Sequence, residues 1–195
     1  KLKLDGDPSG IVHLAFDATA SRLLAVSENG AAMLWNTADG AVVVDHPPGT
    51  DGAVRGRFNR NGTRLLLEGR QHARLLDAAT GREIGRIAVP QVDVLSFYRN
   101  DDLDRAAIAF SPDGRWLFTP LTSRPPRLWS AETGTEVAAP LPAAEYDSPL
   151  AFDHEGALLL YRSADGVVRV DLSGEPRVST VEGLRGRRLS VSMSE

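Results

Sequence analysis

The stretch AFSPDGRWL at Ala109–Leu117, followed by RLWSAETG at Arg127–Gly134, decides the fold. Each half contains a short apolar run and a turn sequence, and the first half turns at Asp113-Gly114. Asp-Gly between apolar runs is typical of a tight turn that joins two antiparallel strands. No segment of the chain keeps a helical periodicity over ten residues. The sequence therefore predicts β-hairpins that follow one another along the chain.

Both halves recur along the chain as two independent landmarks. A phenylalanine recurs at intervals of 42, 52 and 42 residues: Phe16, Phe58, Phe110 and Phe152. A glycine that ends the second half recurs at intervals of 41, 53 and 40 residues: Gly40, Gly81, Gly134 and Gly174. A period of about 40–45 residues is the length of one four-stranded propeller blade. Both landmarks also place one insertion of about ten residues between the second and third repeats.

Within each period, four short apolar runs separated by turns predict four strands. The strands of the first two repeats are predicted at 11–17, 22–28, 31–37, 41–46, 54–59, 64–69, 72–77 and 82–89. Those of the last two are predicted at 105–110, 115–120, 126–130, 135–139, 148–153, 157–163, 167–172 and 176–181.

The combination of a phenylalanine, an SPDG-like turn and a later LW-x-x-x-TG resembles WD-repeat sequence over essentially the whole chain. The resemblance implies an all-β fold, a β-propeller of the WD-repeat type in which four four-stranded antiparallel blades form an incomplete propeller arc. The family also links its tryptophan by hydrogen bonds to a strand Ser or Thr, a turn Asp and a His. In the first repeat, Ser27, Asn29 and Trp35 match three of these places, whereas Asp7 replaces the histidine. In the fourth repeat, Asp171 takes the place of the tryptophan.

We expect residues 1–195 to form a single WD-repeat segment. Its repeats are predicted at approximately 7–47, 48–90, 101–142 and 143–183, with an insertion loop at 90–104 and orphan strands at 1–5 and 188–195. The orphan strands indicate a segment of a longer propeller, or an arc that another copy completes. The terminal sheets of such an arc would expose apolar faces, and exposed apolar faces drive association.

The insertion and two unusual loops supply the candidate binding residues. By resemblance to the family, the insertion and the loops between the second and third strands lie on one face. Arg70, Tyr98, Arg99 and Arg124 would then converge there as a partner-binding surface. Tyr and Arg are the residue types that anchor protein interfaces. The alternative interpretation is a loop that only decorates the fold.

Composition argues against most other kinds of site. The chain has no cysteine, which excludes disulfides and thiolate chemistry, and its net charge of −4 gives no basic field for nucleic acid. Its apolar runs are too short for a membrane-spanning helix. The four histidines have no metal-binding spacing, and no nucleophile elbow, P-loop or dinucleotide motif is present. We therefore expect no catalytic residue, cofactor, metal, nucleic acid or membrane partner.

The expected function is that of a non-catalytic protein–protein interaction scaffold. It would be a WD-repeat segment of a larger, cytoplasmic bacterial protein, serving as the sensor or docking module of a signalling protein. Its partner would be a protein, or other domains or blades of the same chain, with self-association through open terminal blades. The alternative is an enzyme-associated propeller, such as the lid of an α/β-hydrolase or a TolB-like or lactonase-like propeller. The mostly apolar inner strands favour the scaffold.

Overall fold

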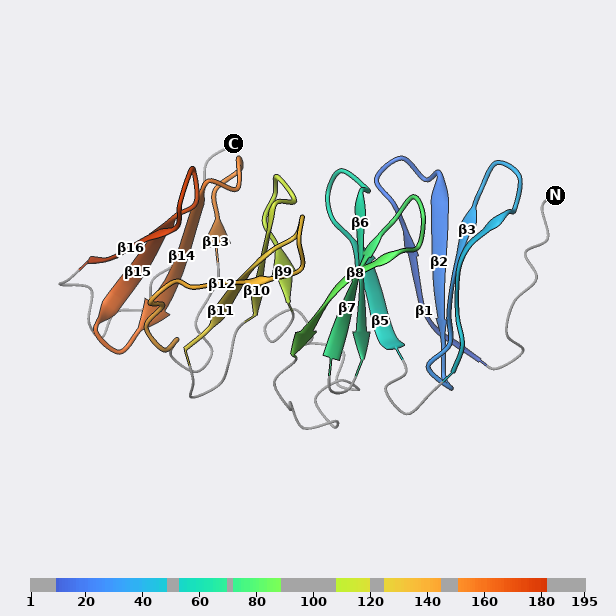
Figure 1. Cartoon of the computed structure of the whole chain (residues 1–195), viewed down its shortest axis with the longest axis horizontal. Helices are drawn as coiled ribbons and strands as arrows, with labels where there is room; N and C mark the ends of the chain where they lie inside the picture. The colour runs from blue at the N-terminus through green and yellow to red at the C-terminus, as the bar shows by residue number, and fades with distance from the viewer. Residues whose placement is uncertain are drawn as a thin grey trace. The chain divides into compact units, whose positions relative to one another are not determined.

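The computed structural model describes residues 10–48, 53–69, 72–88, 108–119, 125–144 and 151–181. Within these residues the protein is all-β: it forms four antiparallel sheets of four strands each and has no helix (Figure 1). The described part accordingly contains no helix that could cross a bilayer. The chain divides into two compact units, residues 1–91 with 131–135 and residues 92–130 with 136–195.

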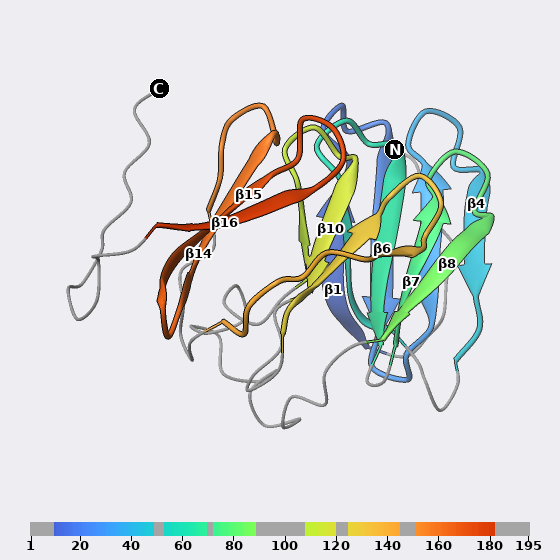
Figure 2. The ribbon, with the colours of Figure 1, turned by 60° about the vertical axis from the view of Figure 1, so that its left-hand side comes forward.

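Each sheet consists of four strands in chain order. Unit 1 contains the first sheet, with strands β1 (Ile11–Phe16), β2 (Arg22–Ser27), β3 (Ala32–Asn36) and β4 (Val42–His46). It also contains the second sheet, with β5 (Ala53–Phe58), β6 (Arg64–Gly69), β7 (His72–Asp77) and β8 (Glu83–Ala88). Unit 2 contains the third sheet, with β9 (Ala109–Phe110), β10 (Trp116–Thr119), β11 (Arg127–Ser130) and β12 (Glu136–Val137). Its fourth sheet, visible in Figure 2, has β13 (Ala151–Phe152), β14 (Leu158–Ser163), β15 (Gly166–Asp171) and β16 (Arg177–Val181).

All sixteen predicted strands are confirmed, and most end within one or two residues of the predicted bounds. The exceptions are β9 and β13, whose predicted first halves lie outside the described residues. Hairpin turns explain this success, because their residue preferences are local and fix where each strand begins.

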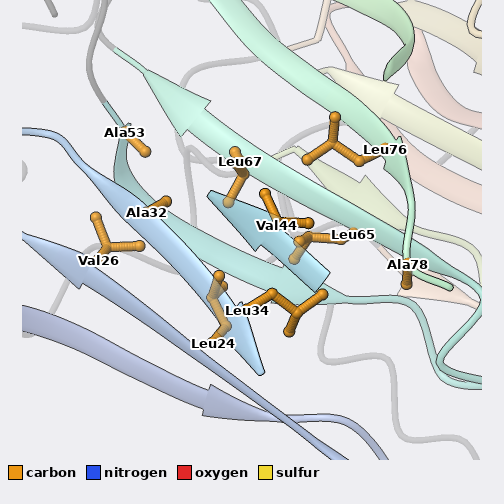
Figure 3. Close-up of a cluster of buried hydrophobic side chains, with 10 residues drawn as sticks. All are labelled: Leu24, Val26, Ala32, Leu34, Val44, Ala53, Leu65, Leu67, Leu76 and Ala78. Atoms are coloured by element: carbon orange, nitrogen blue, oxygen red, sulfur yellow. The ribbon is translucent and has the colours of Figure 1, made fainter. Parts of the chain in front are cut away.

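The core of unit 1 lies between its two sheets (Figure 3). One face of the first sheet presents Leu24, Leu34 and Val44, which are cross-strand neighbours along β2, β3 and β4. They pack with Leu65 and Leu67 of the second sheet, and both of these leucines are almost fully buried. Burying such a side chain stabilises the fold by about 1.5–3 kcal/mol. The face-to-face packing of two sheets is therefore the main source of stability in this unit.

Unit 2 has its own core, centred on two aromatic rings. Phe118 of β10 and Tyr161 of β14 lie 5.7 Å apart between ring centroids, at an interplanar angle of 45°. The Tyr161 hydroxyl donates a hydrogen bond of 2.8 Å to the carbonyl of Pro142. Burial raises the pKa of Tyr161 above its ordinary value, so the hydroxyl stays protonated and keeps this bond.

One turn recurs in all four sheets, directly after the landmark phenylalanine. The residue that follows it accepts a hydrogen bond, through a side-chain oxygen, from the backbone N–H five residues later. The four bonds measure 2.9–3.0 Å and join Asp17 to Arg22, Asn59 to Arg64, Ser111 to Trp116, and Asp153 to Leu158. Three turns use a glycine with positive φ at the fourth position, and the first uses Ala20 with a φ of 55°. The common geometry explains why different side chains occupy the same place.

The tryptophan hydrogen bond occurs in the third repeat and not in the first. Trp129 Nε1 donates to Thr119 Oγ1 over 3.1 Å, whereas Trp35 Nε1 is buried with no acceptor among the described residues. The register explains the difference: the residue equivalent to Thr119 in the first sheet is Ala25, not Ser27. The prediction that Asp171 takes the tryptophan place of the fourth repeat was also wrong. Leu159 pairs with Val170, as Leu23 pairs with Trp35 in the first sheet, so Val170 takes that place.

Replacing Thr119 with valine is expected to destabilise unit 2 by about 1–2 kcal/mol, because the buried Trp129 N–H would lose its acceptor at nearly constant side-chain volume. The free energy of unfolding from urea denaturation measures this loss. Ala25→Ser is the converse variant, since it offers Trp35 an acceptor and should raise the stability of unit 1. A Thr119→Val protein as stable as the wild type would contradict the assignment.

Candidate functional site

The four predicted binding residues lie outside the described part of the chain. Arg70, Tyr98, Arg99 and Arg124 all fall there, as does the insertion at 90–104. Their convergence on one surface therefore stays a prediction. The described residues instead present two other features in unit 1, a polar cleft and an exposed apolar face.

The polar cleft, called the turn cleft below, encloses about 280 Å³. It is formed by the turns between β1 and β2, between β5 and β6, and after β7. Its lining residues are mostly polar or charged: Asp17, Thr19, Ser21, Arg22, Asn61, Gly62, Thr63, Arg64, Asp77 and Ala79. The cleft therefore joins the first repeat to the second on the side where the recurrent turns lie.

Asp17 anchors the first-sheet wall of the turn cleft. Its carboxylate accepts hydrogen bonds from Thr19 Oγ1 at 3.1 Å, Ser21 Oγ at 2.8 Å and the backbone N–H of Arg22 at 3.0 Å. Burial by itself would raise the pKa of Asp17, but these hydrogen bonds outweigh it and hold the pKa below its ordinary value. Asp17 is therefore ionised at neutral pH and fixed in one orientation.

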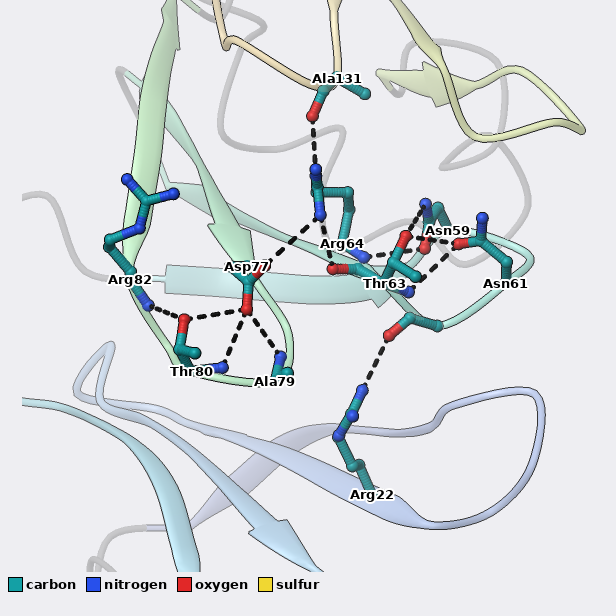
Figure 4. Close-up of polar contacts among 11 residues, drawn as sticks. Arg22, Asn59, Asn61, Thr63, Arg64, Asp77, Ala79, Thr80, Arg82 and Ala131 are labelled. Carbon is teal, nitrogen blue, oxygen red and sulfur yellow. Dashed lines mark hydrogen bonds and ion pairs between the residues drawn. The ribbon is translucent and has the colours of Figure 1, made fainter.

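Two arginines tie the turns around the cleft together (Figure 4). Arg22 Nη1 donates to the carbonyl of Gly62 at 2.8 Å, which links the first sheet to the second. Arg64 Nε donates to the carbonyl of Ala131 at 2.9 Å, and its Nη1 lies 3.5 Å from Asp77 Oδ2. These contacts place the guanidinium groups of Arg22 and Arg64 on either side of the turn between β5 and β6.

Asp77 forms the opposite wall. Its Oδ1 accepts hydrogen bonds of 2.9 Å from Thr80 Oγ1 and from the Thr80 N–H. The hydrogen bond from the Thr80 hydroxyl is the largest cause that lowers the pKa of Asp77, and it outweighs the effect of burial. Both carboxylates of the cleft are therefore ionised at neutral pH.

The polar groups of the turn cleft are largely taken up by hydrogen bonds between and within its turns, as in a structural joint. A general acid needs a proton near neutral pH, and lowered pKa values leave Asp17 and Asp77 without one. The Ser21 hydroxyl donates to Asp17 and has no histidine beside it among the lining residues. Among the described residues, no group of three or more His, Cys, Asp or Glu could hold a metal ion.

The lowered pKa of Asp17 predicts a loss of stability in acid. The pKa of Asp17 is lower in the folded state than in the unfolded state. Its contribution to the free energy of unfolding is therefore complete at a pH above the unfolded-state pKa and is lost as the pH falls through the folded-state pKa. Asp17→Asn should keep the turn, since Asn59 fills this place in the second repeat. The variant should lose less unfolding free energy than the wild type between pH 7 and pH 3. An equal loss in both proteins would contradict this role.

The second feature is an exposed apolar surface on the first sheet, called the open face below. It consists of Ile11, Val12, Leu14, Phe16 and Val42, which are 58%, 51%, 56%, 59% and 51% exposed. By register, Leu14 and Phe16 lie opposite Ala25 and Leu23 on the sheet face that points away from the Leu24 core. β1 and β4 are the two edge strands of the sheet, and Ala25 and Trp35 between them on the same face are buried, so the exposed residues form two strips along its edges. An exposed apolar area of a few hundred Å² is common on monomeric proteins and is often functional.

An incomplete arc predicts that a terminal sheet exposes apolar residues, and the first sheet does so on β1 and β4. In the second sheet the equivalent Phe58 is partly buried and packs against the core of unit 1. The same pattern is therefore covered in one repeat and open in the other. Only the packing of the sheets distinguishes the two cases.

Comparisons with known proteins bear on the fold alone. No protein-family model matches the chain, and no curated protein matches it significantly. Among solved structures, the chain is similar to the computationally designed Ika4 protein, with a TM-score of 0.52 and 16% sequence identity. The similarity covers 92% of this chain and 96% of that chain. Because 1119 chains of solved structures match, the architecture is widely used and does not specify a function.

Proposed function

We propose that this protein is a non-catalytic protein-binding scaffold of the WD-repeat type, and that its four sheets are successive blades of an incomplete propeller arc. It serves as the sensor or docking module of a larger protein. The open face is the observation that carries this proposal.

The shape and composition of the open face favour a protein partner. Its five side chains belong to Ile, Val, Leu and Phe and are each more than half exposed. They lie on β1 and β4, the two edge strands of one sheet, whereas small molecules prefer concave pockets. The buried centre of a protein interface is apolar and poor in charge, as this surface is.

The repeated local structure supports the WD-repeat part of the proposal. The same hydrogen-bonded turn follows the landmark phenylalanine in every repeat. The bond between Trp129 and Thr119 is the tryptophan-to-strand link that the sequence resemblance implies. The turn accepts Asp, Asn or Ser at the same place, so it is compatible with degenerate repeats.

Affinity capture, in which the purified wild type and variants retain partner proteins, tests the proposal. The double variant Leu14→Asp, Phe16→Asp adds two charges to the open face and should reduce partner capture at least tenfold. A matched control, Ala38→Asp with Ala164→Asp, adds the same charges at exposed turn positions and should capture as the wild type does. Equal capture by all three proteins would overturn the open face as the binding surface.

The predicted loop surface is tested separately. Charge reversal at Arg99 and Arg124 should weaken capture if these residues form part of the binding surface. Partner capture that is unaffected by both charge reversals would contradict the predicted loop surface and leave the open face as the binding surface.

A further inference from the structure

The fourth sheet differs from the first on the face that corresponds to the Leu24 core. In the first sheet this face carries Leu24, Val26, Leu34 and Val44, which are all buried. Cross-strand pairing identifies the equivalent residues of the fourth sheet as Leu160, Arg162, Arg169 and Ser179. Three of the four apolar positions are therefore charged or polar in the fourth sheet.

The exposure of the fourth sheet agrees with this difference. Its strands alternate between a buried face with Leu159, Tyr161, Val168 and Val170 and an opposite face whose residues are partly or fully exposed. Arg169 on the opposite face is 51% exposed and lies 3.9 Å from Asp171. Packing an apolar surface on this face would remove water from guanidinium groups, which is unfavourable. This charged face is thus a poor partner for the open face.

We propose that the open face binds the open face of a second copy of the chain, in a two-fold symmetric dimer. This inference rests on the proposed function and names the partner. A two-fold dimer built on this patch alone pairs the patch of one copy with the same patch of the other, so apolar side chains meet apolar side chains. Asp45 also lies on this side of the sheet, opposite Met33 on the edge strand β4, and is exposed. Head-to-tail association would instead lay the open face on Arg162 and Arg169.

The size of the open face sets the expected affinity. Five side chains that are slightly more than half exposed offer roughly 300–500 Å² per copy. Stable interfaces bury about 800 Å² per partner, so this dimer is small and weak. We expect dissociation in the micromolar range, with monomers at low concentration and dimers at tens of micromolar.

Sedimentation velocity over a range of protein concentrations tests the proposal. The wild-type mass should rise from 21.0 kDa to twice that value and stop there. Leu14→Asp, Phe16→Asp should remain a monomer at all concentrations, with an unchanged circular dichroism spectrum. The control Ala38→Asp, Ala164→Asp should dimerise as the wild type does. A wild type that stays monomeric, that grows beyond two copies, or whose association is lost on Arg169→Glu overturns the proposal, because head-to-tail association can also close into a ring of two copies.

A single spin label distinguishes the symmetry of the dimer directly. The chain has no cysteine, so Val42→Cys provides a unique labelling site on the open face. In the proposed dimer both labels lie at the contact between the two open faces and give one short distance. Head-to-tail association places each label against the fourth sheet of another copy, so a long distance or a series of distances contradicts the proposal. Two outcomes separate this proposal from the proposed function. If the wild type is monomeric but the variant Leu14→Asp, Phe16→Asp captures less partner protein, only self-association is refuted. If the wild type dimerises but the same variant captures as much partner protein, only the proposed binding of other proteins is refuted.

Discussion

Replacing Phe118 with alanine is expected to lower the free energy of unfolding of unit 2 by about 3–5 kcal/mol. The side chain is 1% exposed and is among the largest that are fully buried. Its ring contacts Tyr161 across the core, so truncation leaves a cavity between the third and fourth sheets and removes an aromatic contact. Urea denaturation followed by tryptophan fluorescence measures the loss, since Trp116 and Trp129 both lie in unit 2.

Phe16 provides the matched control for this substitution. It occupies the landmark place of the first repeat and is 59% exposed, so Phe16→Ala should change the stability of unit 1 by well under 1 kcal/mol. The measurement belongs at low protein concentration, where the proposed dimer is dissociated. Similar losses for Phe118→Ala and Phe16→Ala would contradict the assignment of core and surface.

Replacing Gly85 with alanine is expected to destabilise unit 1 by about 1–3 kcal/mol, because the added methyl group has no space. A Cβ at Gly85 would lie 2.8 Å from the carbonyl oxygen and 2.9 Å from the Cα of Gly134. Both are backbone atoms, and Gly134 has a φ of +69°, so neither chain segment can move aside easily. The midpoint of thermal or urea denaturation reports the effect.

Gly174 is the control for the glycine variant. A Cβ added there meets nothing within 4 Å, so Gly174→Ala should be neutral or slightly stabilising through its effect on the unfolded chain. If Gly85→Ala proved equally neutral, the close approach of Gly85 and Gly134 would be refuted.

The strands were predictable because the residues that determine them are neighbours in sequence. Asp113-Gly114 marks the turn between β9 and β10, and similar turns bound most other strands. Cross-strand partners were harder to predict, because they depend on register. The family resemblance assigned Ser27 to Trp35, yet the register places Ala25 at that position and leaves the indole N–H without an acceptor among the described residues. A shift of two residues within a strand keeps the same side of the sheet but changes the neighbour.

The sites were less predictable than the strands, for a different physical reason. The turn cleft depends on Arg22 reaching a carbonyl forty residues away, at Gly62. Bonds from a side chain to a distant backbone oxygen require no particular residue at the acceptor position, so they leave no motif. Exposure of Phe16 depends on which sheet face is covered, and the sequence repeat makes Phe16 and Phe58 look alike. The predicted cluster around Arg99 stays a prediction.

The strand order within each sheet has a consequence for how the chain acquires its structure. Since every sheet pairs only strands that are consecutive in the chain, each strand's hydrogen-bond partner lies in an adjacent segment. Such low contact order favours fast formation, because little loop-closure entropy is lost before the first contacts form. Each sheet can therefore assemble on the ribosome as soon as its own forty or so residues have emerged. In unit 1, the first sheet then has its Leu24 face uncovered until the second sheet forms.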